Sequence, residues 1–438
     1  MPPNPTPTPA STTAPASTTA PASTTAPAST TAPASTTAPA STTAPASTTA
    51  PASTTAPAST TASGSSAASA FAAQASAAAS PASTTPRPSS TQASSTSSYI
   101  PPAQPAGAAP LLSVRDLHTS FPLRSALLRR VVGEIQAVAG VSFDIPAGGT
   151  LGLVGESGSG KSTVARTIIG LEKARSGSIV FEGEELTSLP KASMRRVRRQ
   201  LQMIFQDPYA SLNPRATVEQ IISEAWEIHP DVVPRNRHRA EVRDLLERVG
   251  LNPDHAKRYP HQFSGGQRQR IGIARALALR PKLVICDEAV SALDVSVQAQ
   301  VLNLLADLRR DLGLAYLFIA HDLSVVRHIS DQVAVMYLGR VVETATQDEL
   351  FQRPLHPYTQ ALLSAVPDPK PWTKPEREPI IIGGDVPSPA DPPSGCRFRT
   401  RCWKAEDICA EQEPALETRL DRHPTACHFA TDLAGATR

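Results

Sequence analysis

Short apolar segments recur along the chain at 151–154, 283–286, 317–320 and 333–338. They do not alternate with polar residues, which is typical of strands that are buried on both faces of a parallel sheet. Between the second and third segments, apolar residues recur at helical spacing and are followed by Gly313, a typical helix stop. These residues are Val297, Val301, Leu304, Leu305, Leu308 and Leu312. Alternating strands and helices predict an α/β fold.

Chemically distinctive residues stand directly after three of these predicted strands. Gly155 follows the first strand, Asp287 and Glu288 follow the second, and His321 follows the third. In an open parallel sheet, ligands bind at the carboxyl ends of the strands. We therefore expect these residues to converge on one nucleotide.

The segment 150–163 reads T-L-G-L-V-G-E-S-G-S-G-K-S-T and predicts a strand, a phosphate-binding loop and a helix, in that order. Glycines let backbone N–H groups surround an anion, and the helix that follows points its positive end at the same place. Lys161 is predicted to pair with the β- and γ-phosphates. An ordinary glycine turn is the alternative, which the flanking strand and helix disfavour. The expected nucleotide-binding residues are Gly155, Ser157, Gly158, Ser159, Gly160, Lys161, Ser162 and Thr163.

The second strand and its end, L-V-I-C-D-E at 283–288, have the form of a Walker B motif. The Asp287 carboxylate is expected to hold Mg²⁺, and Glu288 is placed to polarise the attacking water as a general base. Acidic residues commonly follow strands, and a lone histidine such as His321 is more often structural. Together with the phosphate loop, the pattern favours catalytic roles for both Glu288 and His321.

The first part of the chain has a different composition. The hexamer P-A-S-T-T-A is repeated nine times over 9–62, and Arg87 is the only charged residue before Arg115. Such a segment buries too little to offset its ordering entropy, so we expect residues 1–110 to be disordered. An O-glycosylated stalk is an alternative, but no export signal is recognisable at Met1. A start codon assigned too far upstream would explain the repeat equally well.

Charge and hydropathy exclude some classes of function. The net charge of +3 is too small to argue for a nucleic-acid partner, and no apolar run approaches the length of a membrane span. Four of the five cysteines lie after residue 395, and with no export signal this usage favours the reducing cytoplasm.

Further motifs resemble those of ATP-binding cassette (ABC) ATPases. Residues 263–267, F-S-G-G-Q, resemble the family signature through Ser264, Gly265, Gly266 and Gln267. Gln206 resembles the Q-loop glutamine, Asp294 in S-A-L-D the D-loop aspartate, and His321 the switch histidine. The motifs occur in the order that the family shows.

The resemblance implies that two such subunits sandwich ATP, with the signature of one chain facing the ATP held by the other. It implies Mg²⁺ bound by Ser162, Gln206 and Asp287, with Gln206 and His321 joining Glu288 in catalysis. A helical subdomain at about 206–279 would face the membrane permease. Phe121 would be the residue that stacks on adenine, although a plain core role is an equal alternative.

Within the family, G-G-Q at 265–267 and V-S-A-L-D at 290–294 resemble the second ATPase subunit, called F. Three segments narrow the resemblance to bacterial oligopeptide and dipeptide importers. They are Q-D-P-Y-A-S-L-N-P at 206–214, V-S-A-L-D-V-S at 290–296 and H-P-Y-T at 356–359. The implied partners are a second ABC ATPase, two integral-membrane permease subunits and an extracytoplasmic peptide-binding protein, with this chain peripheral on the cytoplasmic face of the membrane. Ala289 departs from the proline that is usual there, a change we expect to be tolerated.

The expected division is a tail at 1–110, an ABC nucleotide-binding domain at 111–345, and an extension at 346–438 of the kind found in oligopeptide transporters. Nickel or glutathione importers of the same family remain alternatives. So do a soluble ABC protein of translation or repair and a module that binds ATP without turnover. A single cassette disfavours the soluble class, and Glu288 with His321 disfavours the module.

The extension carries Cys396, Cys402, Cys409 and Cys427, and no pair has the tight spacing of zinc sites. Four thiolates suit a [4Fe–4S] cluster, and the tail resembles that of peptide-importer ATPases in which such a cluster is known. Zinc and metal-free buried thiols are the alternatives. Cys286 lies within a predicted strand and is expected to be a core residue.

A basic cluster precedes Gln206 and consists of Lys191, Arg195, Arg196, Arg198 and Arg199. A solvated helix face is the favoured interpretation. The alternative is a contact with lipid headgroups or acidic permease loops.

Overall fold

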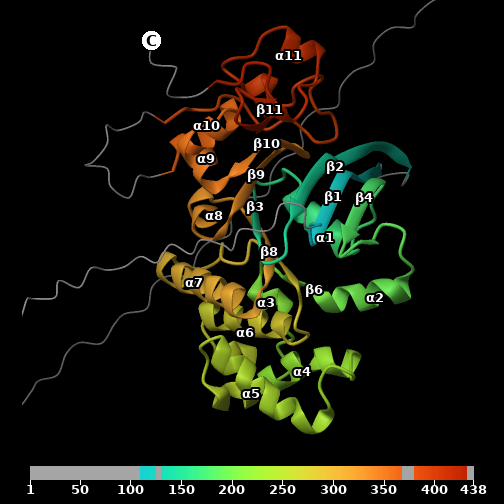
Figure 1. Ribbon diagram of the computed structural model, residues 1–438, viewed down its shortest axis with the longest axis vertical. Helices are drawn as coiled ribbons and strands as arrows, with labels where there is room; N and C mark the ends of the chain where they lie inside the picture. The colour runs from blue at the N-terminus through green and yellow to red at the C-terminus, as the bar shows by residue number, and fades with distance from the viewer. Residues whose placement is uncertain (1–108, 125–129, 367–378, 432–438) are drawn as a thin grey trace, which may run out of the picture. The chain divides into compact units, whose positions relative to one another are not determined.

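The computed structural model describes residues 109–124, 130–366 and 379–431 (Figure 1). Apart from its last two residues, the predicted repeat tail lies outside the described residues. No helix in the described part of the chain is both long and apolar enough to cross a membrane.

Within the described residues, the larger sheet has eight strands in the order β11-β12-β10-β9-β3-β8-β7-β6. Its five strands from β9 to β6 are mutually parallel, and β3 is buried along its whole length. The four strands predicted from apolar runs are all present in it. The parallel strands are β3 (Thr150–Val154), β6 (Leu201–Ile204), β7 (Leu283–Asp287), β8 (Ala315–Ala320) and β9 (Gln332–Tyr337).

The sheet continues beyond the predicted end of the cassette. β10 (Arg340–Thr346) runs antiparallel to β9, and β12 (His423–Thr425) pairs with β10 through Glu343 and Thr425. β11 (Glu417–Arg419) adds the last strand. The C-terminal extension is therefore joined to the nucleotide-binding sheet by backbone hydrogen bonds.

A second, antiparallel sheet has the order β2-β1-β4-β5 and was not predicted from the sequence. The β1–β2 ladder contains several register shifts, which interrupt the regular alternation of apolar and polar residues. The buried side chains of this sheet join those of β3 and α1 (Lys161–Ile168) in one core. The strands are β1 (Leu112–Arg124), β2 (Val131–Ile145), β4 (Ser176–Phe181) and β5 (Glu184–Glu185).

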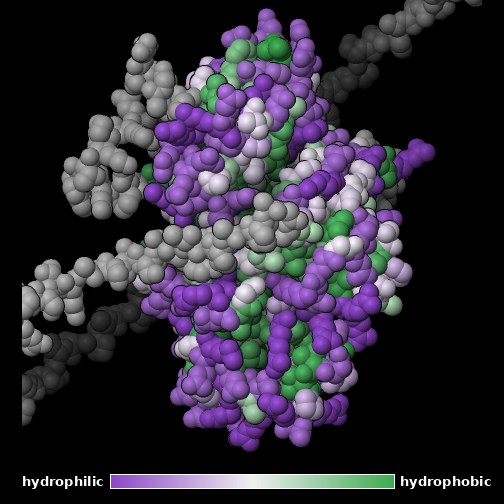
Figure 2. Space-filling view, in the orientation of Figure 1, coloured by the Kyte–Doolittle hydropathy of each residue, from purple (hydrophilic) through white to green (hydrophobic). Residues whose placement is uncertain are grey.

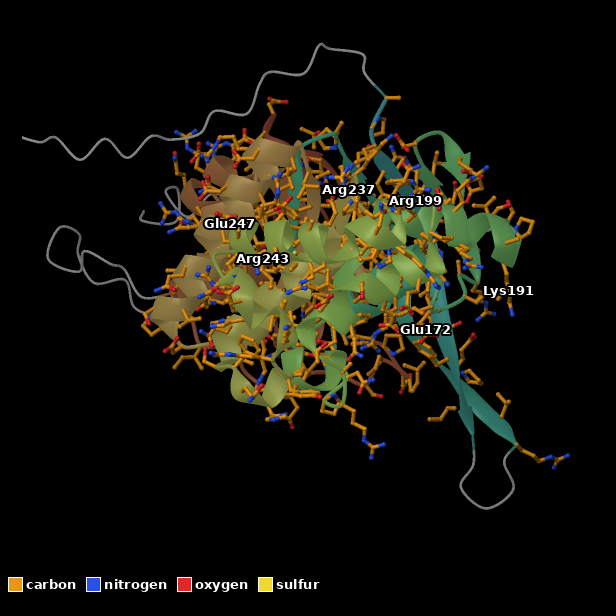
Figure 3. The ribbon with its side chains drawn as sticks, turned by 90° about the horizontal axis from the view of Figure 1, so that it is seen from below. Glu172, Lys191, Arg199, Arg237, Arg243 and Glu247 are labelled. Carbon is orange, nitrogen blue, oxygen red and sulfur yellow. The ribbon has the colours of Figure 1, made fainter. Side chains whose placement is uncertain are left out.

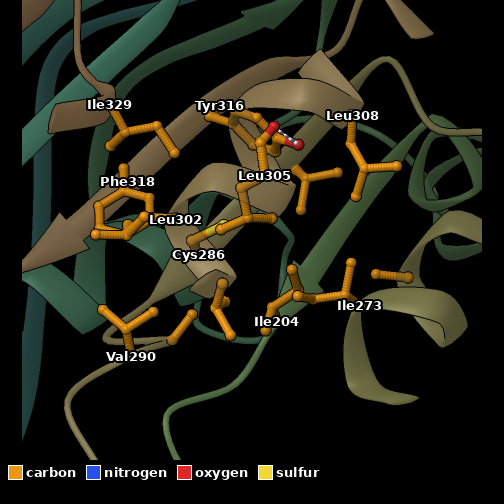
Figure 4. Packing of buried hydrophobic residues seen from close by; sticks show 14 of the residues in the cluster. Ile204, Ile273, Cys286, Val290, Leu302, Leu305, Leu308, Tyr316, Phe318 and Ile329 are labelled. Atoms are coloured by element: carbon orange, nitrogen blue, oxygen red, sulfur yellow. Dashed lines mark hydrogen bonds between the residues drawn. The ribbon is translucent and has the colours of Figure 1, made fainter. Parts of the chain in front are cut away.

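The predicted amphipathic helix is α7 (Val295–Leu312), and Gly313 ends it in the left-handed conformation with φ of 65°. Its inner face packs on the sheet, where Leu302, Leu305 and Leu308 lie beside Phe318 and Cys286 (Figure 4). Leu312, which was predicted to lie on this face, is 43% exposed because it sits in the last turn.

The segment 206–279 is helical. Its helices are α3 (Pro208–Ser211), α4 (Val218–Ile228), α5 (His238–Arg248) and α6 (Gly265–Leu277). Thr217 and Gln220 form a capping box at the start of α4. Trp226 of α4 is buried and donates a hydrogen bond of 2.8 Å to the carbonyl of Ala278, which ties α4 to the end of α6.

Shorter helices complete the described chain. The α-helices are α1 (Lys161–Ile168), α2 (Lys191–Gln200), α8 (Leu323–Ile329), α9 (Gln347–Gln352), α10 (Pro357–Ser364) and α11 (Ile408–Glu411). The 3-10 helices are η1 (Arg235–Arg237), η2 (Pro253–Lys257), η3 (Pro260–Gln262) and η5 (Arg399–Arg401).

Candidate nucleotide-binding site

The loop between β3 and α1 has a backbone that only glycine fits at two positions. Gly160 has φ of 102°, and a Cβ there would lie 2.0 Å from the carbonyl oxygen of Ala137. A Cβ on Gly155 would lie 2.1 Å from the carbonyl oxygen of Met336. The neighbouring strands therefore hold the loop closely, and the glycines allow its tight turn.

Helix α1 begins directly after this loop, and its N-cap residue, Gly160, offers no side-chain hydrogen bond. The first N–H groups of a helix have no partner within the helix. At α1 these groups remain available to an anion, and the helix dipole favours negative charge at the same point. The arrangement suits a phosphate group.

Lys161 is the first residue of α1, and its side chain is buried. Its Nζ donates hydrogen bonds to the carbonyl oxygens of Gly155 at 2.8 Å and Glu156 at 2.9 Å. Burial lowers the pKa of Lys161, while the nearby carboxylates of Glu288, Asp287 and Glu156 act in the opposite direction. The ammonium group is thus held against the loop that would surround the phosphates.

Ser162 and Asp287 meet at the end of β7, where the Ser162 hydroxyl donates to Asp287 Oδ1 at 2.7 Å. Asp287 is buried, and this burial raises the pKa of its carboxyl, with the hydrogen bond from Ser162 opposing the shift. Hydroxyl and carboxylate oxygens are ligands that Mg²⁺ prefers. Two of the three expected magnesium ligands are therefore in contact.

Gln206, the third expected ligand, follows β6 and donates from Nε2 to Glu288 Oε2 at 2.6 Å. His321 follows β8, and its Nδ1 lies 3.7 Å from the same Glu288 oxygen. Glu288 itself has φ of 48°, an uncommon conformation for a residue with a side chain. Its N–H donates to the carbonyl of Ile319, which fixes the strained residue between β7 and β8.

The structure thus brings together the residues after β3, β7 and β8 that the sequence predicted to converge, and it adds Gln206 after β6, which the family resemblance had indicated. Their exposure differs: the Glu288 side chain is 14% exposed, whereas that of His321 is 55% exposed. The catalytic roles of Glu288, His321 and Gln206 remain predictions.

The signature segment lies at the start of α6. Ser264 and Gln267 form a capping box, in which Ser264 Oγ accepts from the N–H of Gln267 and Gln267 Oε1 accepts from the N–H of Ser264. Gly266 packs on α7, because a Cβ there would lie 2.3 Å from Val297 Cγ1. Asp294 caps α7. Among the described residues, no hydrogen bond joins the signature to the phosphate loop of this chain.

Phe121 lies on β1 opposite Ile135 and is partly exposed. Its contact with adenine remains a prediction. Ala289, which replaces the usual proline, is buried directly after Glu288.

Three residues at the phosphate loop were not singled out from the sequence. The N–H of Glu156 donates to Tyr358 Oη at 2.9 Å, and Arg401 pairs with the Glu156 carboxylate at 2.9 Å. Tyr358 belongs to the H-P-Y-T segment, which had signalled the family but not this contact. Arg401 directly precedes Cys402, and no spacing in the sequence links it to residue 156.

The four cysteines of the extension gather in one region. The Cys396 N–H donates to the Cys409 carbonyl at 2.8 Å. Burial raises the pKa of Cys396 to about 11 and that of Cys427 to about 12, and in both cases the neighbouring thiols add to the effect. In the part of the chain that the structure describes, no group of three or more His, Cys, Asp or Glu side chains is arranged to hold a metal ion. Cys286 is buried in β7, as expected.

The basic cluster lies on α2, where four of its five residues have partners within the chain. Arg195 donates to the Ile228 carbonyl, Arg198 donates to those of Ile169 and Gly170, Arg196 pairs with Glu184, and Arg199 pairs with Asp231. Lys191 and Arg199 lie at the surface seen in Figure 3. The cluster therefore connects α2 to its neighbours as well as facing solvent.

Comparison with known proteins agrees with this geometry. Residues 138–291 match the model of the ABC transporter family, and residues 342–409 match that of the oligopeptide/dipeptide transporter C-terminal region. The oligopeptide transport ATP-binding protein AppF of Bacillus subtilis (strain 168) is 54% identical over 320 residues, which are 73% of this chain and 97% of AppF.

The oligopeptide transport ATP-binding protein OppF of Escherichia coli (strain K12) is 51% identical over 323 residues, 73% of this chain and 96% of OppF. A solved post-hydrolysis dimer of the ATP-binding cassette MJ0796 is 24% identical, with a TM-score of 0.49 over 54% of this chain and 98% of that one. The two family models and the near full-length relatives agree with the motifs at β3, β7, β8 and α6. The chain therefore belongs to the ABC transporter family, in the group of oligopeptide transport ATP-binding proteins.

Proposed function

We propose that this chain hydrolyses ATP to power the import of peptides through an ABC transporter. The proposal rests on one observation: Lys161 lies close to the carboxylates of Asp287 and Glu288. The phosphate-binding loop therefore lies next to both carboxylates. Its support is the similarity to AppF and OppF, which extends over nearly their whole length.

In the proposed reaction, Lys161 and the N-terminus of α1 hold the β- and γ-phosphates. Glu288 takes a proton from water while the water oxygen forms a bond to the γ-phosphorus. The bond from that phosphorus to the bridging oxygen breaks, and ADP and phosphate leave. The bond from Gln206 Nε2 orients the Glu288 carboxylate, and His321 lies beside it to contact the γ-phosphate.

Mg²⁺ suits the oxygen atoms of Ser162 in the first turn of α1, Asp287 at the end of β7 and Gln206 after the neighbouring strand β6. When bound, the ion would neutralise charge on the phosphates. Ser162 donates to Asp287 and Gln206 donates to Glu288, so both side chains are held beside the carboxylates at this end of the sheet.

The proposed assembly is a pair of ABC ATPases with two integral-membrane permease subunits and an extracytoplasmic binding protein, and this chain would sit on the cytoplasmic face of the membrane. The helical segment 206–279 would face the permease. Tyr209, two residues after Asp207, is 64% exposed, with the Arg268 guanidinium stacked 3.9 Å above its ring. Figure 2 shows hydrophobic residues gathered among hydrophilic ones over the region of α3 to α6.

A [4Fe–4S] cluster on the four cysteines is part of the proposal, with zinc as the alternative. The donor set suits such a cluster in its chemistry, because four thiols lie near one another, two of them buried and two partly buried. Their present arrangement is not that of a formed site, so cluster binding would draw the thiols together. Anaerobically purified protein is expected to be brown, and Cys402→Ser to lose the colour. Colourless protein with one zinc per chain would support zinc. Protein that contains neither metal would show that the four cysteines do not form a metal site.

The transport function is tested by rebuilding the complex with its permease in lipid vesicles and measuring ATP-dependent uptake of labelled peptides. The Glu288→Gln complex is the matched control. Uptake of peptides only with the active complex supports the proposal. ATP-driven uptake of nickel chelates or glutathione in place of peptides would show that the transporter has a different substrate. Failure to associate with any permease would favour a soluble ABC ATPase.

A further inference from the structure

We propose that the C-terminal extension completes the phosphate loop, with Arg401 and Tyr358 as positioning residues that set the affinity for ATP. The inference rests on the proposed nucleotide site. It assigns to the extension a role in nucleotide binding within the same chain.

Both residues contact Glu156, the second residue of the loop. Arg401 donates from one guanidinium nitrogen to both carboxylate oxygens of Glu156, at 2.9 Å and 3.2 Å. Tyr358 Oη accepts from the Glu156 N–H at 2.9 Å. The side chain and the backbone of this residue are therefore both fixed by the extension.

Glu156 in turn holds Lys161, because its carbonyl oxygen accepts from Lys161 Nζ at 2.9 Å. The same carbonyl accepts from the N–H of Ser159 at 3.2 Å. The two residues of the extension thus lie one hydrogen-bonded step from the lysine that is expected to bind the phosphates. A shift of Glu156 would move the Lys161 ammonium and the following turn together.

The contact has a rigid support. Tyr337, Tyr358 and Phe398 are all buried, and their ring centroids lie 4.8 to 5.4 Å apart. Tyr337 Oη also accepts from Arg401 at 3.4 Å. These rings come from β9, α10 and the segment before η5, so the extension and the sheet share one packed cluster behind the loop.

A second support lies at the start of α10. The buried Glu343 carboxylate accepts from the N–H groups of Leu355 at 2.7 Å and His356 at 3.1 Å, and it contacts His423 Nε2 at 2.7 Å. His356 Nδ1 then accepts from the N–H of Tyr358 at 3.1 Å. This chain of bonds fixes the position of Tyr358 from β10 and β12.

Charge gives the contact a second effect. Glu156 places a negative charge in a loop that is expected to bind a polyanion, and Arg401, whose side chain is only 9% exposed, compensates for it. At a separation of roughly 10 Å, one uncompensated charge would lower the affinity for an anion of three or four charges about tenfold, even with the dielectric constant of water. Arg401 is therefore expected to act on binding more than on turnover.

The test measures the affinity of the full-length chain for a fluorescent ATP analogue, and KM and kcat of the assembled transporter. Arg401→Gln is expected to weaken binding about tenfold and to raise KM, with kcat at saturating ATP nearly unchanged. The double variant Glu156→Gln with Arg401→Gln is expected to recover most of the affinity, because both charges are gone. Tyr358→Phe, which removes the acceptor for the Glu156 N–H, is expected to weaken binding several-fold.

Arg399→Gln is the matched control, because Arg399 lies in the same turn but bonds to Ser394 within the extension. It should bind ATP as the unmodified chain does. If Arg401→Gln does not fold, the single variant Glu156→Gln tests the inference instead. This variant leaves the positive charge of Arg401 uncompensated and is expected to bind ATP more tightly. Unchanged affinity would overturn the inference.

The outcomes separate the inference from the proposed function. If Lys161→Ala weakens binding about 100-fold while Arg401→Gln binds normally, the inference is wrong and the nucleotide site stands. If Lys161→Ala also binds normally, the site itself is wrong. If Arg401→Gln lowers the melting temperature and the double variant restores no affinity, Arg401 only stabilises the fold, and the inference is again overturned.

Discussion

Two helices of this chain begin with glycine-containing turns, yet their first turns are built differently. At α1 the N-cap is Gly160, and no side chain bonds to the first N–H groups. At α6 the N-cap is Ser264, and Ser264 and Gln267 satisfy each other's N–H groups in a capping box. The first end is left open for an anion. The second end is complete as it stands and presents an exposed Ser264 hydroxyl to whatever lies opposite.

The two helix starts also differ in how far the rest of the chain encloses them. The α1 end is closed in by β3, β7 and the C-terminal extension, with Lys161 and Asp287 buried. In the described residues, the α6 end has no hydrogen bond to that loop. The predicted phosphate site and the signature segment are therefore separate in the chain, and in the proposed pair of ATPases they would meet across the two chains.

The largest effect is expected from Lys161→Ala, which removes the cation from the α1 end. Loss of a charged hydrogen bond to phosphate corresponds to a loss in affinity of about 100-fold, and turnover is expected to disappear with it. Nucleotide titration of the single chain and phosphate release by the assembled transporter measure the two effects. Lys173→Ala, at an exposed position, is the control. Normal ATP affinity in Lys161→Ala would show that α1 is not the phosphate end.

Glu288→Gln separates binding from chemistry at the same end. The variant keeps an oxygen that accepts from Gln206 Nε2 but cannot take a proton from water. Turnover in the complex is expected to fall by ~10²–10⁴-fold, while ATP binding is retained. Glu247→Gln, on the exposed side of α5, should change neither quantity. Full turnover in Glu288→Gln would eliminate Glu288 as the base.

Ser264→Ala tests the α6 end. The single chain should bind ATP with normal affinity, because Ser264 does not contact its own phosphate loop. In the complex, loss of one hydrogen bond to the partner's nucleotide is expected to slow turnover roughly 10- to 100-fold. A variant chain paired with an unmodified partner assigns the loss to the partner's site. Weakened ATP binding by the isolated Ser264→Ala chain would contradict the separation of the two ends.

The smallest effect is expected from Thr217→Ala, which opens the capping box of α4. That box resembles the one at α6 but lies at a helix with no predicted nucleotide contact. Its loss is expected to cost about 1 kcal/mol of stability, with ATP affinity and turnover unchanged. Denaturant unfolding of both the Thr217→Ala and Ser264→Ala chains shows how much of the Ser264 effect is stability. An equal loss of turnover in both variants would show that Ser264 acts only as a helix cap.

Much of the site could be predicted because its signals are local. Gly155, Gly160 and Lys161 lie in one short segment of the chain, and Asp287 and Glu288 directly follow an apolar run. Since parallel strands bring their carboxyl ends to one edge, these separate segments could be expected to meet. The apolar runs also located β3, β7, β8 and β9 to within two residues.

Other elements gave weaker signals. The four residues of β6 include Gln202, so this strand lacks a continuous apolar run. The sheet of β1, β2, β4 and β5 is interrupted by register shifts that obscure its alternation. The described extension also has few long apolar patterns, and β12 joins the sheet through a single register pair with β10.

The amino-acid sequence by itself determined the phosphate loop, the carboxylates at the end of β7 and the family, because each depends on residues that are close together in the chain. Only the tertiary structure decided which residues stand behind that loop. Glu156 and Arg401 are 245 positions apart, and Glu156 and Tyr358 are 202 apart. No periodicity or local spacing connects residues at such separations, because their meeting depends on how β10, α10 and the cysteine-bearing segment fold back on the sheet.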